Sequence, residues 1–202
     1  MTLAGDATHL RPTPSQTVGP YFTMRLSSEG DNVLTTPETI GVRIRIEGRV
    51  LDGDRNHIED ALVELWQADS GGRYHHPADH RDDVPADPCF CGFGRCTSDF
   101  LTGAYSFLTV KPGPVPHPNG QMQAPHVSLT IQARGMLNPT FTRLYFADEE
   151  AANAADPVLQ SVPEERRSTL IAELVEGADS SVPTYRFDIR YQGDDETVFF
   201  DV

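Results

Sequence analysis

Several short stretches of this sequence alternate between apolar and polar residues, and this alternation limits the fold more than any other feature. Val42–Val50 alternates throughout, and Ala61–Gln67 places Val63 and Leu65 on the face opposite Glu64. Because successive side chains of a strand point to opposite faces, this period indicates β-strands. The number of such stretches predicts an all-β fold of the β-sandwich type, the further candidates being Ala104–Val110, His126–Gln132, Phe141–Phe146, Thr184–Tyr191 and Thr197–Asp201.

Two segments between the predicted strands have a helical composition. Asp148–Ala155 is rich in Glu and Ala, and Pro163–Glu173 begins with proline and carries an apolar face. The chain before the strands is polar and interrupted by prolines, which predicts an extended N-terminal arm over residues 1–40. We find neither an internal repeat nor a linker, so residues 41–202 are expected to form a single β-sandwich domain with one or two short helices.

The charge of the chain limits its partners. Its 202 residues carry a formal charge of -14, and Lys111 is the only lysine. Phosphate backbones and anionic membranes bind clustered Lys and Arg, so we expect no nucleic-acid and no membrane partner. No apolar run approaches the roughly 20 residues that span a bilayer, and the first residues lack the basic start and apolar core of a signal peptide. The sequence is typical of a cytoplasmic protein.

A long loop, Asp69–Phe100, is rich in Gly, Pro, Asp and His, and loops of this length are usually functional or interfacial. It contains the three cysteines, Cys89, Cys91 and Cys96. An odd number in a cytoplasmic protein indicates thiols rather than a disulfide framework. Their spacing could supply three ligands to zinc or an iron–sulfur cluster, but such sites usually take four ligands from paired Cys-x2-Cys elements. The simpler interpretation is small buried residues in a turn-rich loop.

A series of ordered motifs, running from about Thr13 to the end of the chain, resembles the intradiol aromatic-ring dioxygenases. They are Thr13–Tyr21, Leu65–Tyr74, Val110–Gly120, Ala124–Ser128, Arg143–Phe146, Tyr185–Arg190 and Glu196–Asp201. The resemblance implies cleavage of a catechol, such as 3,4-dihydroxybenzoate, by O2 between its two hydroxylated carbons. It also implies, in the catalytic chains of the family, a non-haem ferric ion held by two tyrosines and a His-x-His pair, with an arginine shortly before that pair.

This sequence departs from the family pattern at the positions that would bind iron. The resemblance assigns a tyrosine ligand to the position of Val115, the second histidine to Ser128 and the arginine to Gln123. The other tyrosine belongs to the loop around His80–Asp83, which contains none. His126 alone keeps a ligand residue type, and one imidazole cannot provide the multidentate site that iron needs. We therefore expect His126 to be a hydrogen-bonded strand histidine, with no metal ligand and no catalytic residue in this chain.

The resemblance then implies a supporting role beside a partner. It implies an iron-free alpha chain in a hetero-oligomer with a beta chain of the same fold, which holds the Fe(III). In the family, the alpha arm lines the substrate cavity of the neighbouring beta chain, and the corresponding residues here are Thr17, Gly19, Pro20 and Tyr21. Arg134 matches an arginine near this cavity, where a guanidinium would attract a small aromatic acid. Two alternatives stay open: an arm anchored at an interface, and a surface or interface salt bridge of Arg134.

Two other functions also stay open. An autonomous metalloenzyme could draw ligands from His75, His76, His80 and the cysteines, and a non-catalytic β-sandwich could carry aromatic acids as a homo-oligomer. Adjacent His75 and His76 face opposite ways in an extended chain, and solvated loop histidines are the simpler interpretation. Glu64 shares a face with Trp66 and could be a buried acid, but neither a base nor a nucleophile stands beside it in the sequence.

Overall fold

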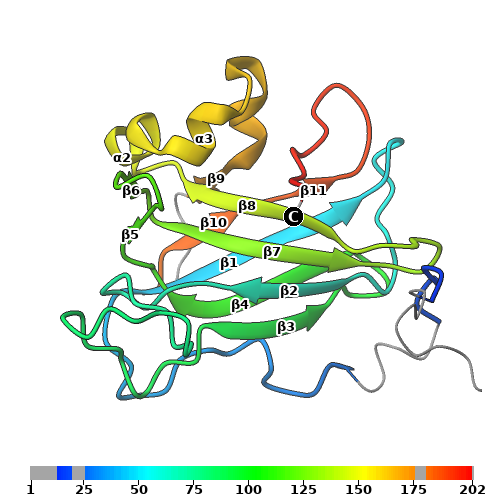
Figure 1. Cartoon of the computed structure of the whole chain (residues 1–202). Helices are drawn as coiled ribbons and strands as arrows, with labels where there is room; N and C mark the ends of the chain where they lie inside the picture. The colour runs from blue at the N-terminus through cyan, green and yellow to red at the C-terminus, as the bar shows by residue number, and fades with distance from the viewer. Residues whose placement is uncertain (1–12, 20–25, 176–180, 202) are drawn as a thin grey trace, which may run out of the picture.

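Five of the predicted strands form the long strands of the molecule (Figure 1). The computed structural model describes residues 13–19, 26–175 and 181–201. The alternating stretches bury their apolar positions, as in Ile44 and Ile46, which are fully buried. The all-β prediction is therefore confirmed by β1 (Arg43–Leu51), β2 (Leu62–Trp66), β4 (Ala104–Val110), β7 (His126–Gln132) and β8 (Thr140–Phe146).

These strands belong to a sheet that curves round until it nearly closes. Four further strands complete it: β3 (Phe93–Thr97), β9 (Ile171–Leu174), β10 (Thr184–Arg186) and β11 (Ile189–Arg190). The order is β11-β1-β10-β9-β8-β7-β2-β3, and β4 pairs with β1 along its other edge. The two edges of the curved sheet are therefore β3 and β4. A separate hairpin joins β5 (Val115–Pro116) to β6 (Met122–Gln123).

A segment from the predicted arm lies between the two edges. The amide of Leu108 in β4 donates to the carbonyl of Asn32 at 2.9 Å, and the amide of Leu34 donates to the carbonyl of Leu108 at 2.8 Å. On the other side, the amide of Arg95 in β3 donates to Asp31 at 3.0 Å. A Cβ on Gly94 would lie 2.6 Å from the Leu34 side chain, so glycine permits this approach. We name residues 31–35 the closing segment, because they satisfy backbone groups of both edge strands.

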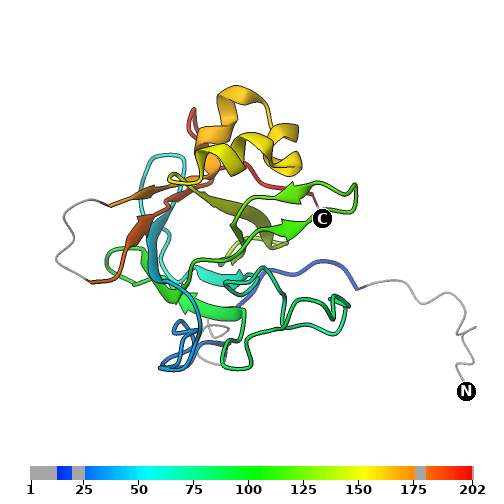
Figure 2. The same cartoon turned by 90° about the vertical axis from the view of Figure 1, so that its left-hand side faces the viewer.

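The main core fills the interior of the curved sheet with residues from alternate positions of the strands, including Val63 and Leu65 of β2, Phe107 of β4 and Leu129 of β7. A second cluster lies under α2 (Glu150–Ala155), α3 (Pro157–Ser161) and the 3-10 helix η2 (Glu164–Leu170). These helices cover one side of the sheet beyond β8 and β9 (Figures 1 and 2). Among the described residues, none of the helices has the length and apolar character to cross a bilayer.

The predicted second helix, Pro163–Glu173, is wrong from Ile171 onward. Its first part is the 3-10 helix η2, but Ile171–Leu174 is strand β9, which pairs with β8 and β10. Pairing on both sides outweighs the local helical pattern, because the backbone of β9 fills the gap between two other strands. The first predicted helix is confirmed, and it begins two residues later than expected, at Glu150.

Two predicted strands are shorter than expected. Thr184–Tyr191 divides into β10 and β11 because Asp188 interrupts the pairing: its carboxylate, rather than a backbone carbonyl, accepts the amide of Arg49 at 2.9 Å. Thr197–Asp201 is not a strand. Its one β-bridge is the isolated antiparallel pair of Phe200 with Phe141. Conversely, β3 lies inside the predicted loop Asp69–Phe100, where Gly94, its second residue, hid the strand pattern.

Candidate functional site

Some of the positions that the family resemblance assigns to the iron site lie in the wall of one pocket. Its volume is about 590 Å³, and Val115 of β5 and Gln123 of β6 form part of its wall beside the loop that contains His80 and Arg81. We name it the β5–β6 pocket. Its full lining is Trp66, Tyr74, His76, Ala78, Asp79, His80, Arg81, Val115, Pro116 and Gln123.

His126 is the hydrogen-bonded strand histidine that the sequence predicts. Its side chain is 3% exposed, and Nδ1 lies 2.7 Å from the carbonyl of Ala124. Its ring lies 5.9 Å from the ring of Tyr145. Burial lowers the pKa of His126 to about 4, and the positive charge of Arg143 acts in the same direction. The imidazole is therefore neutral at physiological pH.

Arg143 is the central charge of this region, and the sequence analysis did not single it out. Strand register aligns Trp66 of β2 with Ser128 of β7, and Ser128 with Arg143 of β8. Arg143 Nη1 donates to Gln123 Oε1 at 2.7 Å. The signal that could have identified Arg143 is its place on the outward face of β8, between the buried residues Thr142 and Leu144.

The donor set does not fit a ferric ion. Val115 offers no phenolate, Ser128 offers no imidazole, and a guanidinium stands beside the one histidine. Within residues 13–19, 26–175 and 181–201, no three His, Cys, Asp or Glu side chains gather as a metal would require. Iron needs several anionic or neutral donors converging on one point, and a fixed cation opposes its charge.

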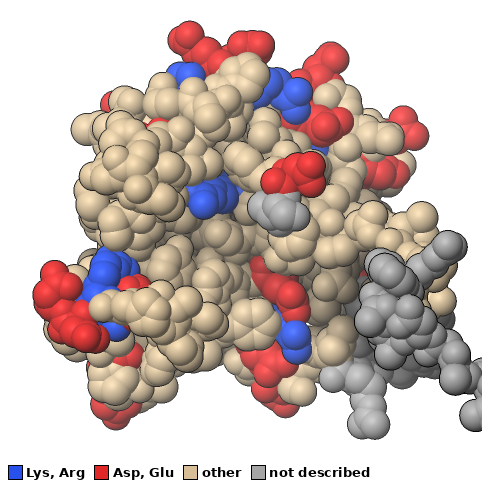
Figure 3. All heavy atoms as spheres, viewed as in Figure 1, with Lys and Arg blue, Asp and Glu red and all other residues tan. Residues whose placement is uncertain are grey.

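Aromatic rings and an ion pair form the remaining walls. The rings of Trp66 and Tyr74 are stacked, with centroids 5.7 Å apart, and His76 meets Trp66 edge-on at 6.1 Å. Arg81 donates to both carboxylate oxygens of Asp79, and this contact holds the pKa of Asp79 well below its usual range. Burial raises the pKa of the Tyr74 hydroxyl, so it stays protonated. Figure 3 shows that basic side chains on this face of the molecule lie mostly beside acidic ones.

Two of the residues predicted to line a partner's cavity meet at the opposite end of β7. The Thr17 hydroxyl accepts a hydrogen bond from the amide of Gly135 at 2.7 Å, next to Arg134. Arg134 Nε pairs with Asp60 at 2.5 Å, and its side chain is 48% exposed. Gly19 is exposed, whereas Pro20 and Tyr21 lie outside the described residues. The seven residues of β7 separate this cluster from His126 by about 20 Å.

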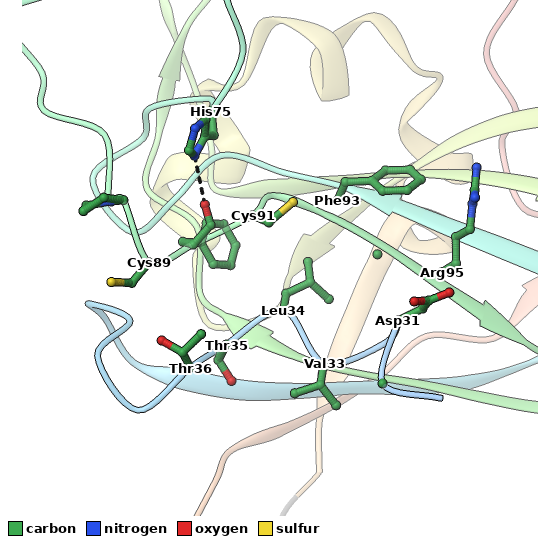
Figure 4. A pocket seen from close by; sticks show the side chains of 14 residues that line it. Asp31, Val33, Leu34, Thr35, Thr36, His75, Cys89, Cys91, Phe93 and Arg95 are labelled. Atoms are coloured by element: carbon green, nitrogen blue, oxygen red, sulfur yellow. Dashed lines mark hydrogen bonds between the residues drawn. The ribbon is translucent and has the colours of Figure 1, made fainter. Parts of the chain in front are cut away.

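The histidines and cysteines of the long loop are divided among three pockets, and Cys96 lines one of them apart from the others. His76 and His80 line the β5–β6 pocket, whereas His75 lines another of about 580 Å³ together with Cys89 and Cys91 (Figure 4). His75 Nδ1 lies 3.2 Å from the carbonyl of Phe90, and the sulfurs of Cys89 and Cys91 point apart in Figure 4. The three cysteines are free thiols. The structure therefore does not bring together the ligands of an autonomous metal centre.

Glu64 is not an isolated buried acid. Its carboxylate accepts a hydrogen bond from Arg95 Nε at 2.6 Å across the β2–β3 pair. The ion pair lies on the outward face of the sheet and is partly exposed to solvent. The side chain of Arg95 is 32% exposed and that of Glu64 is 18% exposed. A carboxylate paired with a guanidinium across two neighbouring strands is a structural contact.

Comparison with known proteins shows the family to which the chain belongs. The profile of the family described as "Dioxygenase" matches residues 17–193. The chain belongs to the intradiol ring-cleavage dioxygenase family. It is 45% identical to the protocatechuate 3,4-dioxygenase alpha chain of Burkholderia cepacia, over 96% of this chain and 100% of the relative. The alpha chain of Pseudomonas putida is 40% identical, over 95% and 97% of the two chains.

Other intradiol dioxygenases share less of the sequence. The protocatechuate 3,4-dioxygenase beta chain of Burkholderia cepacia is 37% identical, over 82% of this chain and 71% of the relative. The solved dioxygenase domain of a dioxygenase–carbohydrate-binding fusion from Streptomyces sp. SirexAA-E superposes with a TM-score of 0.56 at 24% identity, over 89% and 97% of the chains. This likeness supports the fold. The family implies oxidoreductase chemistry with non-haem iron in the assembled enzyme.

Proposed function

We propose that this chain is the iron-free alpha subunit of a protocatechuate 3,4-dioxygenase. The assembled enzyme cleaves 3,4-dihydroxybenzoate with O2 between the hydroxylated carbons and gives 3-carboxy-cis,cis-muconate. A beta chain of the same fold holds the Fe(III), and this chain supports assembly and shapes the substrate cavity. The observation that carries the proposal is the donor set: Val115 in the wall of the β5–β6 pocket and Ser128 of β7 stand where the family resemblance expects ligands, and Arg143 supplies a cation beside His126.

The position of the predicted cavity residues also supports a role at a partner. Thr17 and Arg134 lie at the end of β7 opposite to His126, about 20 Å away. They are too far from the β5–β6 pocket of their own chain to line it, which supports a role at a site shared with a partner. In the proposal, the arm within residues 1–40 docks on the beta chain through Thr17, Gly19, Pro20 and Tyr21, and residues 41–202 form the domain that supports it.

Expression of the chain alone and together with a beta chain tests this function. We expect the isolated chain to contain no stoichiometric iron and to cleave no catechol, and the mixed complex to do both. One iron per isolated chain would contradict the proposal and favour an autonomous metalloenzyme. In that case His76→Ala and His80→Ala would lower the metal content. Failure to form a mixed complex in size-exclusion chromatography would favour a homo-oligomeric carrier.

The cavity residues are tested by kinetics of the mixed enzyme. We expect Arg134→Gln to raise KM for protocatechuate about fivefold or more with a smaller change in kcat, since a guanidinium near the cavity attracts the substrate carboxylate. Tyr21→Ala, or removal of the first 22 residues, should also raise KM or prevent assembly.

Arg186→Gln is the matched control for the arginine variant. Arg186 is also a half-exposed arginine in an ion pair, with Glu47 at 3.6 Å, but it lies on β10. We expect its KM to equal that of the wild type. If Arg134→Gln lowers stability and leaves KM unchanged, Arg134 serves only as the salt-bridge partner of Asp60.

A further inference from the structure

The β5–β6 pocket presents an aromatic wall of the kind that binds flat ligands. The stacked rings of Trp66 and Tyr74 differ in plane by 14°, and His76 supports Trp66 edge-on. Val115 and Pro116 add apolar lining. The volume of about 590 Å³ lies within the range of small-molecule pockets. An aromatic ring placed in this pocket would gain both apolar contact and ring stacking.

An arginine without a carboxylate partner contacts the lining of this pocket. Arg143 is half-buried, and its Nη1 donates to Gln123 Oε1, whose side chain lines the pocket. In the part of the chain that the structure describes, no carboxylate lies within ion-pair distance of Arg143. The nearby pocket arginine, Arg81, pairs with Asp79. A half-buried guanidinium without a counterion favours an incoming anion.

The nearest buried carboxylate is already in use. Asp156 accepts hydrogen bonds from the amide of Ala124, from the Tyr145 hydroxyl and from the first amides of α3. The carboxylate oxygens of Asp156 therefore accept hydrogen bonds from groups other than the guanidinium of Arg143. The chain has 30 acidic residues, yet the described side-chain hydrogen-bond partners of Arg143 are neutral, namely the carboxamide of Gln123 and the hydroxyl of Tyr145.

We propose that the β5–β6 pocket binds a small aromatic monocarboxylate without transforming it. The ring lies against Trp66 and Tyr74, and the carboxylate replaces the Gln123 carboxamide as the acceptor for Arg143. The inference concerns this chain alone and does not depend on the accessory-subunit proposal. Exposed Asp82 and Asp83, which follow Arg81 in the loop, disfavour ligands of higher negative charge.

The single tryptophan makes the site directly observable. Trp66 is the only tryptophan of the chain and lines the pocket, so its fluorescence reports on this location. We expect titration of the full-length chain with benzoate to change the Trp66 emission saturably, with a Kd below about 1 mM. Benzamide has the same ring without the charge, and its binding should be at least about tenfold weaker.

Three variants test the assigned roles. Arg143→Gln should weaken benzoate binding at least about tenfold and abolish the preference for benzoate over benzamide. Gln123→Ala removes the competing acceptor and should tighten benzoate binding about threefold or more. Ala78→Phe, at an exposed position of the pocket lining, should block both ligands without disturbing the core. Arg49→Gln, an exposed arginine of β1 outside the pocket, is the matched control and should bind as the wild type does.

Several results of these titrations would contradict the proposed binding site or move it elsewhere. Absence of a saturable change at concentrations about ten times the expected Kd would overturn the proposal. Equal affinity for benzoate and benzamide would remove the role of Arg143. If Arg143→Gln does not fold, Gln123→Ala and Ala78→Phe still decide, because they must change affinity in opposite directions. Loss of binding in Arg134→Gln but not in Ala78→Phe would move the site to the other end of β7.

Discussion

At the residue scale, the state of His126 depends on the side chains beside it. Ser128 follows it on the same strand, and Arg143 lies opposite Ser128 in the neighbouring strand. The guanidinium and the burial of the ring both favour neutral imidazole. A residue type that ligates metal in many proteins is thus a buried hydrogen-bonded group here, because its neighbours provide charge of the wrong sign.

The depressed pKa of His126 predicts a pH dependence of stability. In the unfolded chain the imidazole titrates near 6.5, whereas in the folded chain its pKa is about 4. The unfolded state therefore binds the proton first as the pH falls, and stability present above pH 6.5 is lost between pH 6.5 and pH 4. The loss amounts to about 3 kcal/mol.

Urea unfolding at a series of pH values measures this effect. We expect His126→Asn, which keeps a donor near the Ala124 carbonyl but does not titrate, to lose about 3 kcal/mol less than the wild type over this range. His80→Asn, at an exposed loop position, is the control and should follow the wild type. Parallel curves for all three proteins would show that His126 is not the buried neutral group.

At the element scale, Asp156 connects the helical layer to the sheet. It is fully buried, and Oδ1 accepts the amides of Val158 and Leu159 at the start of α3. Oδ2 accepts the amide of Ala124, which precedes β7. One carboxylate therefore caps a helix and fixes the entry to the strand that carries His126. The sequence pattern revealed neither α3 nor this contact.

Removal of the cap should lower stability strongly. We expect Asp156→Ala to reduce the free energy of unfolding by about 3 kcal/mol, because several buried donors lose their acceptor, and Asp156→Asn to cost about half as much. Glu149 stands at the matching position of α2 and makes no side-chain cap bond. Glu149→Ala should cost less than about 1 kcal/mol, since it loses only a partly exposed contact with Lys111. Equal losses in thermal or urea unfolding would contradict the capping role.

At the scale of the whole molecule, the N-terminal region has two separable parts. The closing segment, residues 31–35, joins β3 and β4 and buries Leu34, which is 6% exposed. Thr17, farther toward the N-terminus, contacts Gly135 at the far end of β7. The first part satisfies backbone groups at the edges of the sheet, and the second reaches the surface where we propose a partner.

Two truncations separate these parts. A chain that starts at residue 28 should unfold at nearly the wild-type urea concentration but give a mixed enzyme with raised KM or impaired assembly. A chain that starts at residue 37 should lose at least about 2 kcal/mol of stability, because Leu34 is no longer buried and two strand edges lose hydrogen-bond partners. If both truncations unfold alike, the closing segment does not hold the sheet edges together.

The sequence by itself determined the all-β class, the five long strands and the loss of metal donors. Strand alternation is local, so β1, β2, β4, β7 and β8 follow from neighbouring residues alone. The replacement of ligand types by Val115 and Ser128 follows from residue identity together with the family resemblance, which assigns the ligand positions.

Only the tertiary structure decided the features that depend on partners distant in the chain. Strand β9 forms because β8 and β10 lie on either side of it, against a local helical pattern. Arg143 reaches Gln123, and Thr17 reaches Gly135, across 20 and 118 positions of the sequence. Such contacts depend on how the sheet curves and closes, and no short-range period of apolar and polar residues encodes that curvature.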